Sequence, residues 1–260
     1  MWLDDRHPAP LAPRPPPRAG TRVMNAAPTL SAHPASEEDF VALRRSPLFG
    51  RVSEAAIREL FKNQTALVAG KDARVLTWGE DAATCHIVLR GLVKLFRTSP
   101  SSETAVLAIH GPGRALMLAE GLTGKPCSAS VEAVTPARLM TLDVARLKSQ
   151  MESDPALSRA LLMAASIDLR QLVAHIEELK AMTGPARLAA MIVKLSEAQG
   201  GARQVSLPYE KQLIASALGM TPESFSRAIG QLKAQGVKVA RDKLDIADAG
   251  KLRDFAYFGR

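Results

Sequence analysis

The sequence has only two cysteines, Cys85 and Cys127, among its 260 residues. They lie far apart and form no CxxC pair, which excludes a disulfide framework and a CxxC zinc or redox motif. No apolar run approaches the ~18–20 residues of a membrane span, so we expect no membrane insertion. The N-terminal residues contain no apolar signal-peptide core. With so few cysteines, a protein of the reducing cytoplasm is expected.

Aromatic residues are also scarce, at 4% of the chain. A sequence-tolerant binder of single-stranded nucleic acid needs stacking platforms, which disfavours that class. The net charge is +8, which indicates an anionic partner. Most of the excess falls in the last eighty residues, with twelve Lys or Arg against seven Asp or Glu. Without a motif, an ordinary solvated basic surface would explain this charge equally well.

Proline divides the N-terminal part of the chain. Eight of the 17 prolines fall in residues 1–38, which predicts a disordered tail, and Met24 is an alternative to Met1 as the start. A helix is expected from about Glu37 with Ser36 as its N-cap. A second helix is expected to begin at Ser53 and to end near Lys62.

The region from 65 to 150 contains short segments rich in Val, Ile and Leu, separated by turn residues. They are residues 74–77, 85–89, 92–97, 104–109 and 129–134. Strands at this spacing favour an all-β barrel or sandwich over βαβ units. Two of them flank a tight Arg90-Gly91 turn, which is typical of a hairpin. Residues 39–153 are therefore predicted to form one β-rich domain.

The clearest helical pattern spans residues 154–183, with Asp154 as N-cap and Pro155 at the first helical position. Its apolar residues recur at spacings of three and four, which is typical of a coiled-coil seam. We expect this stripe to form a homodimer interface, although packing onto its own domain is an alternative. The stripe consists of Leu162, Ala165, Leu169, Leu172, Ile176 and Leu179.

The segment 206–237 predicts a helix-turn-helix. A first helix is expected to open at Pro208, and Leu218-Gly219-Met220 supplies a short turn. Thr221 and Pro222 then begin a second helix that ends near Gln235. Residues 237–246 are predicted to form a small hairpin, or wing, turning at residues 241–243.

The N-terminal end of that second helix has side chains suited to reading bases. Glu223, Ser226 and Arg227 share one face, and Arg and Glu are able to read guanine and cytosine. An intrahelical Glu223–Arg227 ion pair is the alternative. Expected phosphate contacts are Thr221, Ser224, Lys211, Lys233, Lys238, Arg241 and Lys243.

Four stretches together resemble the Crp/Fnr superfamily of bacterial transcription regulators. They read SPLF, IVLRGLVKLF, GPARLAAMIVKL and LPYEKQLIASALGMTPESFSRAIGQLKAQGV. The resemblance implies an α+β protein: an N-terminal β-roll (a jelly roll like the cyclic-nucleotide-binding domain), a dimerisation helix, and a winged helix-turn-helix over 184–260. It also implies double-stranded palindromic DNA with TTGAT-like half-sites, where Arg227 would read the guanine and Glu223 the paired cytosine. RNA polymerase is an expected partner.

The sensor departs from the best-known members of that superfamily. The cyclic-nucleotide cassette needs Gly-Glu and a later Arg-Ser/Thr-Ala, whereas Gly113-Arg114 and Pro126-Cys127-Ser128 stand here. We therefore expect neither a cyclic nucleotide nor an iron–sulfur cluster, which needs four thiolates. The sequence instead resembles the Dnr/Nnr branch, whose members are linked to nitric oxide and haem. Candidate haem ligands are His110, His175, His86 and Cys85, together with the methionines.

Three alternatives remain open at the level of sequence. A metal-dependent enzyme on the barrel would need about three clustered ligands, but the barrel contributes only His86 and His110. A regulatory module acting on protein partners would not need the Glu223–Arg227 face. An effector-free regulator would need no ligand at all. A DNA-binding regulator that is not an enzyme is the preferred hypothesis.

Overall fold

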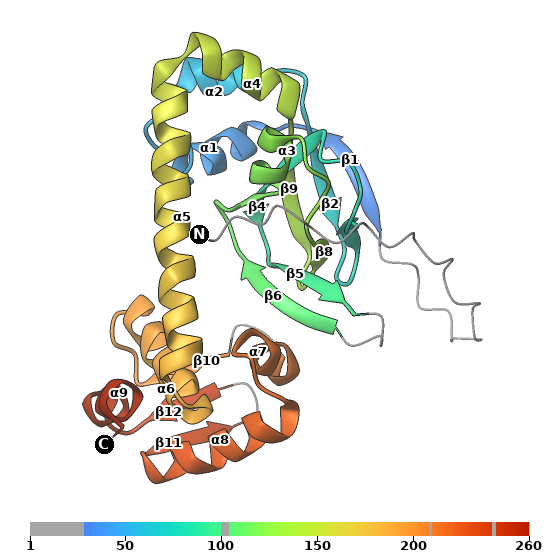
Figure 1. The fold of residues 1–260 in the computed structure, drawn as a ribbon. Helices are drawn as coiled ribbons and strands as arrows, with labels where there is room; N and C mark the ends of the chain where they lie inside the picture. Colours follow the sequence, from blue (N-terminus) through green and yellow to red (C-terminus); the bar gives the residue numbers. More distant parts are fainter. Residues whose placement is uncertain (1–28, 100–103, 208–209, 241–242, 260) are drawn as a thin grey trace, which may run out of the picture.

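A computed structural model of the chain describes residues 29–99, 104–207, 210–240 and 243–259. Figure 1 shows a β-rich domain, a long helix running beside it, and a small mixed domain near the far end of that helix. The expected α+β architecture is confirmed. None of the helices in the described ranges combines the length and the apolar character that crossing a membrane requires.

Part of the segment that the sequence predicts to be disordered is structured. Residues 1–28 lie outside the described part, but β1 (Leu30–Pro34) pairs antiparallel with β2 (Thr65–Ala69). Ser36 then caps α1 (Glu37–Arg45) in a reciprocal capping box with Asp39. The prediction of disorder up to residue 38 is therefore wrong for residues 30–38. All five β1 side chains are exposed, so no apolar pattern marks this strand.

Two sheets build the β-rich domain. The first has the order β1-β2-β9-β4-β7 and the second the order β3-β8-β5-β6. A core rich in small and β-branched residues from both sheets, such as Ala69, Val88 and Val131, lies inside. The sequence predicted five of these strands and missed the others. The remaining bounds are β3 (Arg74–Leu76), β4 (Thr84–Arg90), β5 (Val93–Thr98), β6 (Thr104–His110), β7 (Ala115–Leu116), β8 (Ser130–Ala133) and β9 (Ala137–Asp143).

The Arg90-Gly91 turn joins two sheets and not two paired strands. β4 pairs with β9 and β7, whereas β5 pairs with β6 and β8, so the expected hairpin is wrong. Gly91 has φ +79°, and a Cβ there would lie 2.3 Å from the Pro136 carbonyl oxygen. Glycine is needed at this corner because both the left-handed conformation and the close backbone approach exclude a side chain.

Helices close one end of the barrel and lead out of it. α2 (Glu54–Leu60), α3 (Leu118–Thr123) and α4 (Val144–Ser153) precede the long α5 (Pro155–Ala181). The Asp154 carboxylate accepts hydrogen bonds from the first free backbone N–H groups of α5, as predicted. Only Leu157, Ala160 and Leu161 of α5 are buried, so its first turns pack on the domain and the rest runs past it.

The C-terminal domain packs four helices against a three-stranded sheet of order β10-β12-β11. The predicted wing is confirmed, since Val237 pairs with Ile246 and Ala240 with Lys243. The sequence did not foresee β10 or α9, and the expected helix start at Pro208 lies outside the described residues. The bounds are α6 (Gly184–Ala198), β10 (Gln204–Ser206), α7 (Lys211–Ala217), α8 (Pro222–Ala234), β11 (Val237–Ala240), β12 (Lys243–Ile246) and α9 (Ala249–Phe258).

Candidate nucleic-acid interface and sensor cavity

The turn between α7 and α8 is a helix-turn-helix, as predicted. Gly219 takes φ +64°, and the Thr221 hydroxyl accepts a hydrogen bond from the Ser224 backbone N–H at 3.2 Å. Arg187 of α6 stabilises the turn, because its Nε donates a hydrogen bond to the Leu218 carbonyl oxygen at 2.9 Å. No sequence pattern pointed to this arginine, since its partner is a backbone atom 31 residues further along the chain.

Two sides of α8 have opposite character. Phe225, Ala228 and Leu232 are buried in the domain core. The three expected base-reading residues, Glu223, Ser226 and Arg227, are all exposed on the other side. This side projects from the first two turns of the helix, where free backbone N–H groups favour an anion.

The polar side chains on this exposed side of α8 keep hydrogen-bonding capacity for a binding partner. Among the described residues, no ion pair joins Glu223 to Arg227, so the intrahelical alternative is not what the structure contains. Hydrogen bonds from its own backbone N–H and from Thr221 lower the pKa of Glu223, and the nearby positive charge of Arg227 adds a smaller effect in the same direction. The Ser226 hydroxyl donates to the Pro222 carbonyl oxygen at 3.0 Å, which leaves its lone pairs free to accept.

The expected phosphate contacts surround this helix end and the wing. Thr221, Lys211 and Lys233 are exposed on the helices, and Lys238 and Lys243 are exposed on opposite strands of the wing. Ser224 is half-buried and accepts a hydrogen bond from the Thr221 hydroxyl at 3.1 Å. Arg241 lies outside the described residues.

The apolar stripe along α5 lies open on the protomer. Leu162, Leu169 and Leu172 are 68%, 62% and 55% exposed, and Ala165, Ile176 and Leu179 are exposed as well. Three apolar neighbours that the sequence did not single out, Met163, Ile167 and Val173, widen the exposed surface. So many large apolar side chains on one helix are unusual for a surface in water.

Two of the four histidine and cysteine candidates for haem ligation are buried and two are half-buried. Cys85 and His86 are both buried in β4, where burial raises the pKa of the thiol to about 12 and lowers that of the imidazole to about 4. The Nδ1 atom of His86 lies 3.3 Å from the Thr141 hydroxyl. His110 and His175 are half-buried.

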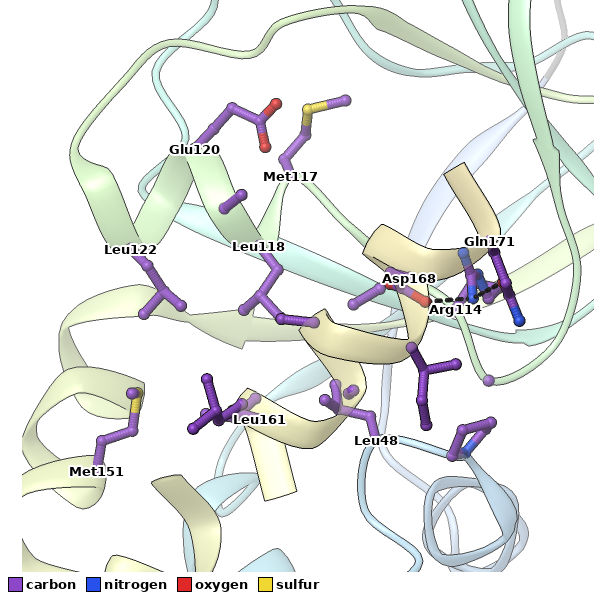
Figure 2. A pocket seen from close by; sticks show the side chains of 18 of the residues that line it. Leu48, Arg114, Met117, Leu118, Glu120, Leu122, Met151, Leu161, Asp168 and Gln171 are labelled. Atoms are coloured by element: carbon purple, nitrogen blue, oxygen red, sulfur yellow. Dashed lines mark hydrogen bonds and ion pairs between the residues drawn. The ribbon is translucent and has the colours of Figure 1, made fainter. Parts of the chain in front are cut away.

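A cavity of about 610 Å³ lies between the barrel and the first half of α5. Figure 2 shows Leu118, Leu122, Met151 and Leu161 around one side of it. On the other side, Arg114 donates hydrogen bonds to Asp168 at 2.6 Å and to Gln171 at 3.1 Å. None of the four histidine and cysteine candidates is among the described residues that line this cavity. The sequence singled out Arg114 but not its partners on α5.

Comparison with known proteins gives the same division of the chain. A model of the cyclic nucleotide-binding domain matches residues 68–154, and a model of the Crp-like helix-turn-helix domain matches residues 186–255. The nitrogen fixation regulation protein FixK of Rhizobium meliloti is 31% identical over 171 residues, which cover 65% of this chain and 76% of that protein.

Two further relatives extend this similarity. A CRP-like cAMP-activated global transcriptional regulator of Mycobacterium tuberculosis is 24% identical over 81% of this chain and 96% of its own length. The solved structure of a regulatory protein from Silicibacter pomeroyi is 35% identical, has a TM-score of 0.60, and covers 85% of this chain and all of that one. These relatives are regulators and not enzymes.

Proposed function

This chain belongs to the Crp/Fnr family of DNA-binding transcription regulators, and from that premise we propose that it acts as a homodimer on a palindrome with TTGAT-like half-sites. The exposed Glu223–Ser226–Arg227 face carries this proposal. Arg227 donates to O6 and N7 of the guanine, and Glu223 accepts from N4 of the cytosine paired with it. Ser226 contacts a neighbouring base edge or phosphate.

The homodimer rests on the open stripe of α5. Pairing Leu162, Leu169 and Leu172 with the same residues of a second copy removes a large apolar surface from water. A two-fold axis along the paired helices then presents two recognition helices to one face of a duplex. Two-fold symmetry requires a palindrome, with half-sites about one helical turn apart.

Direct binding to defined duplexes tests this function. The full-length protein is titrated against a palindrome with TTGAT-like half-sites and against the same duplex with the half-sites scrambled, at one fixed salt concentration. Binding at least about a thousandfold tighter to the palindrome is the expected result. Equal affinity for both duplexes at low and physiological salt contradicts the proposed site. No binding to any duplex favours the alternative of a module acting on protein partners.

For the sensor, we propose control by an effector other than a cyclic nucleotide or an iron–sulfur cluster, as in the Dnr/Nnr branch. Both cysteines are free and buried, which supports the second exclusion. Arg114 already pairs with Asp168, so it offers no free charge to a cyclic phosphate. We propose that the protein acts in the cytoplasm. RNA polymerase is the proposed protein partner of the DNA-bound dimer.

None of the four histidine and cysteine candidates can ligate a haem in the cavity, which is lined instead by two methionines, Met117 and Met151. Cys85 and His86 are enclosed in β4, and neither His110 nor His175 lines the cavity. We expect protein mixed with haem to show the absorption spectrum of free haem, with no Soret shift. A ligated haem spectrum that is lost in His110→Ala or His175→Ala contradicts this expectation and restores haem as the effector.

A further inference from the structure

The cavity beside α5 is large enough for a small molecule and mostly apolar. Its volume of about 610 Å³ lies in the range of sites that enclose drug-sized ligands. Leucine, methionine, alanine and isoleucine side chains from the barrel, α3, α4 and α5 form most of its walls. Among them are Leu118, Ala119, Leu122, Met151 and Leu161.

The polar side chains around the cavity are already paired with one another. Arg114 is engaged by Asp168 and Gln171. The Ser128 hydroxyl donates to the Glu120 carboxylate, and the Ser158 hydroxyl donates to the Met151 carbonyl oxygen at 2.8 Å. The buried side-chain atoms without a partner in the described residues, on Gln150 and Gln235, do not line the cavity.

The paired charges around the cavity favour a ligand without negative charge. The two carboxylates, Asp168 and Glu120, outnumber the single guanidinium of Arg114. An anion entering the cavity would lose its hydration without gaining an unpaired cation, which is costly in an apolar site. A neutral molecule avoids that penalty and gains the burial of its apolar surface.

We propose that this cavity binds a neutral, apolar small molecule. The inference deepens the proposed function, because it names the class of effector for the sensor domain. The cavity walls include Leu162 and Ala165, which also belong to the stripe proposed to pair with a second copy. A ligand in the cavity therefore touches the same turns of α5 that meet the partner.

Two matched dyes test the proposal on the full-length protein. N-phenyl-1-naphthylamine is neutral and apolar, and 1-anilinonaphthalene-8-sulfonate has the same rings with an added sulfonate. We expect the neutral dye to bind with micromolar affinity and the sulfonate about tenfold more weakly. Excess cyclic AMP should not displace the neutral dye. Equal or tighter binding of the sulfonate, or displacement by cyclic AMP, overturns the proposal.

Variants locate the bound dye. Ala119→Trp fills the cavity from an exposed position on α3, and Leu122→Asp adds a carboxylate to its wall. Each should weaken binding of the neutral dye by about tenfold. The control Ala249→Trp, at the exposed start of α9, should leave the affinity unchanged. Thermal melting confirms that each variant is folded.

An unchanged affinity in both cavity variants places the dye elsewhere and overturns the proposal. The same protein samples are also titrated with the TTGAT-like palindrome, so that DNA binding and dye binding are measured independently. Loss of DNA recognition in the wild type would contradict the regulator's site, whereas the dye result concerns the cavity alone.

Discussion

Arg227 is the residue on which the proposed reading of the half-site depends most. It is exposed on α8 and is not tied to Glu223 in the protomer. We expect Arg227→Ala to lose about 1–3 kcal/mol of discrimination at the guanine of each half-site, because two hydrogen bonds to the base are removed. Binding measured across half-site variants checks this. The control Lys233→Ala should weaken all sequences equally, and an unchanged preference in Arg227→Ala would refute its base-reading role.

Asp39 is a buried carboxylate that holds the N-terminal helix to the barrel. Arg138 donates to its two oxygens at 2.7 and 2.6 Å. Burial acts to raise the pKa of Asp39, but the hydrogen bonds from Arg138 and Ser36 outweigh it and lower the pKa. A lowered native pKa means that the stabilisation is full at neutral pH. It is lost as the pH falls below about 3.9, the unfolded value, through the native pKa.

Replacing this carboxylate should therefore change both stability and its pH dependence. We expect Asp39→Asn to lower the free energy of unfolding by about 2–3 kcal/mol at pH 7, because Arg138 loses its charged partner. Below the native pKa the difference from the wild type should shrink. Urea unfolding at neutral and acid pH measures both, and an equal difference at all pH values would contradict the assignment.

At the scale of elements, the corner between β4 and β5 depends on one glycine. Gly91 and Gly79 both have positive φ, but only at Gly91 would a Cβ meet backbone atoms; at Gly79 nothing lies within 4 Å. Gly79→Ala should cost about 1–2 kcal/mol of stability from backbone strain alone. Gly91→Ala should cost clearly more, because the backbone at Pro136, just before β9, must also move. Equal losses in denaturant unfolding would show that the close approach contributes nothing.

The stripe of α5 gives a second prediction at this scale. Leu172 is 55% exposed in the protomer, so a charge there should not disturb the fold. In a symmetric dimer Leu172→Asp removes two apolar contacts, each worth about 1.5–3 kcal/mol, and should raise the dimer dissociation constant by at least about a hundredfold. Sedimentation equilibrium measures it. The exposed, off-stripe Ala174→Asp should stay dimeric, and a dimeric Leu172→Asp would place the interface elsewhere.

At the scale of the whole molecule, a dimer doubles every contact with DNA. Lys238 on the wing is an exposed, proposed phosphate contact. Each lost phosphate contact lowers the slope of log affinity against log salt by about 0.9. Lys238→Ala should therefore lower the slope by about 1.8 in the dimer, and affinity for palindrome and scrambled duplex should fall by similar factors. A decrease near 0.9 would indicate that only one protomer places its wing on the DNA.

Local chemistry explains why much of the architecture was predictable. The caps at Ser36, Asp154 and Thr221 and the α7–α8 turn each depend on a few neighbouring residues, and all were found in the expected places. The exposed face of α8 follows in the same way from helical spacing. Elements without a local pattern were missed, such as the fully exposed edge strand β1.

The sequence by itself determined the helix-turn-helix, the candidate base-reading residues and the apolar stripe of α5, because each is a property of one element and its period. The tertiary structure decided that this stripe is exposed on the protomer. Only the tertiary structure decided that β4 and β5 enter different sheets, that Arg187 supports the turn, and that Arg114 meets Asp168 beside a cavity. Those contacts join residues far apart in the chain. Their partners are chosen by how the elements pack, which no local pattern records.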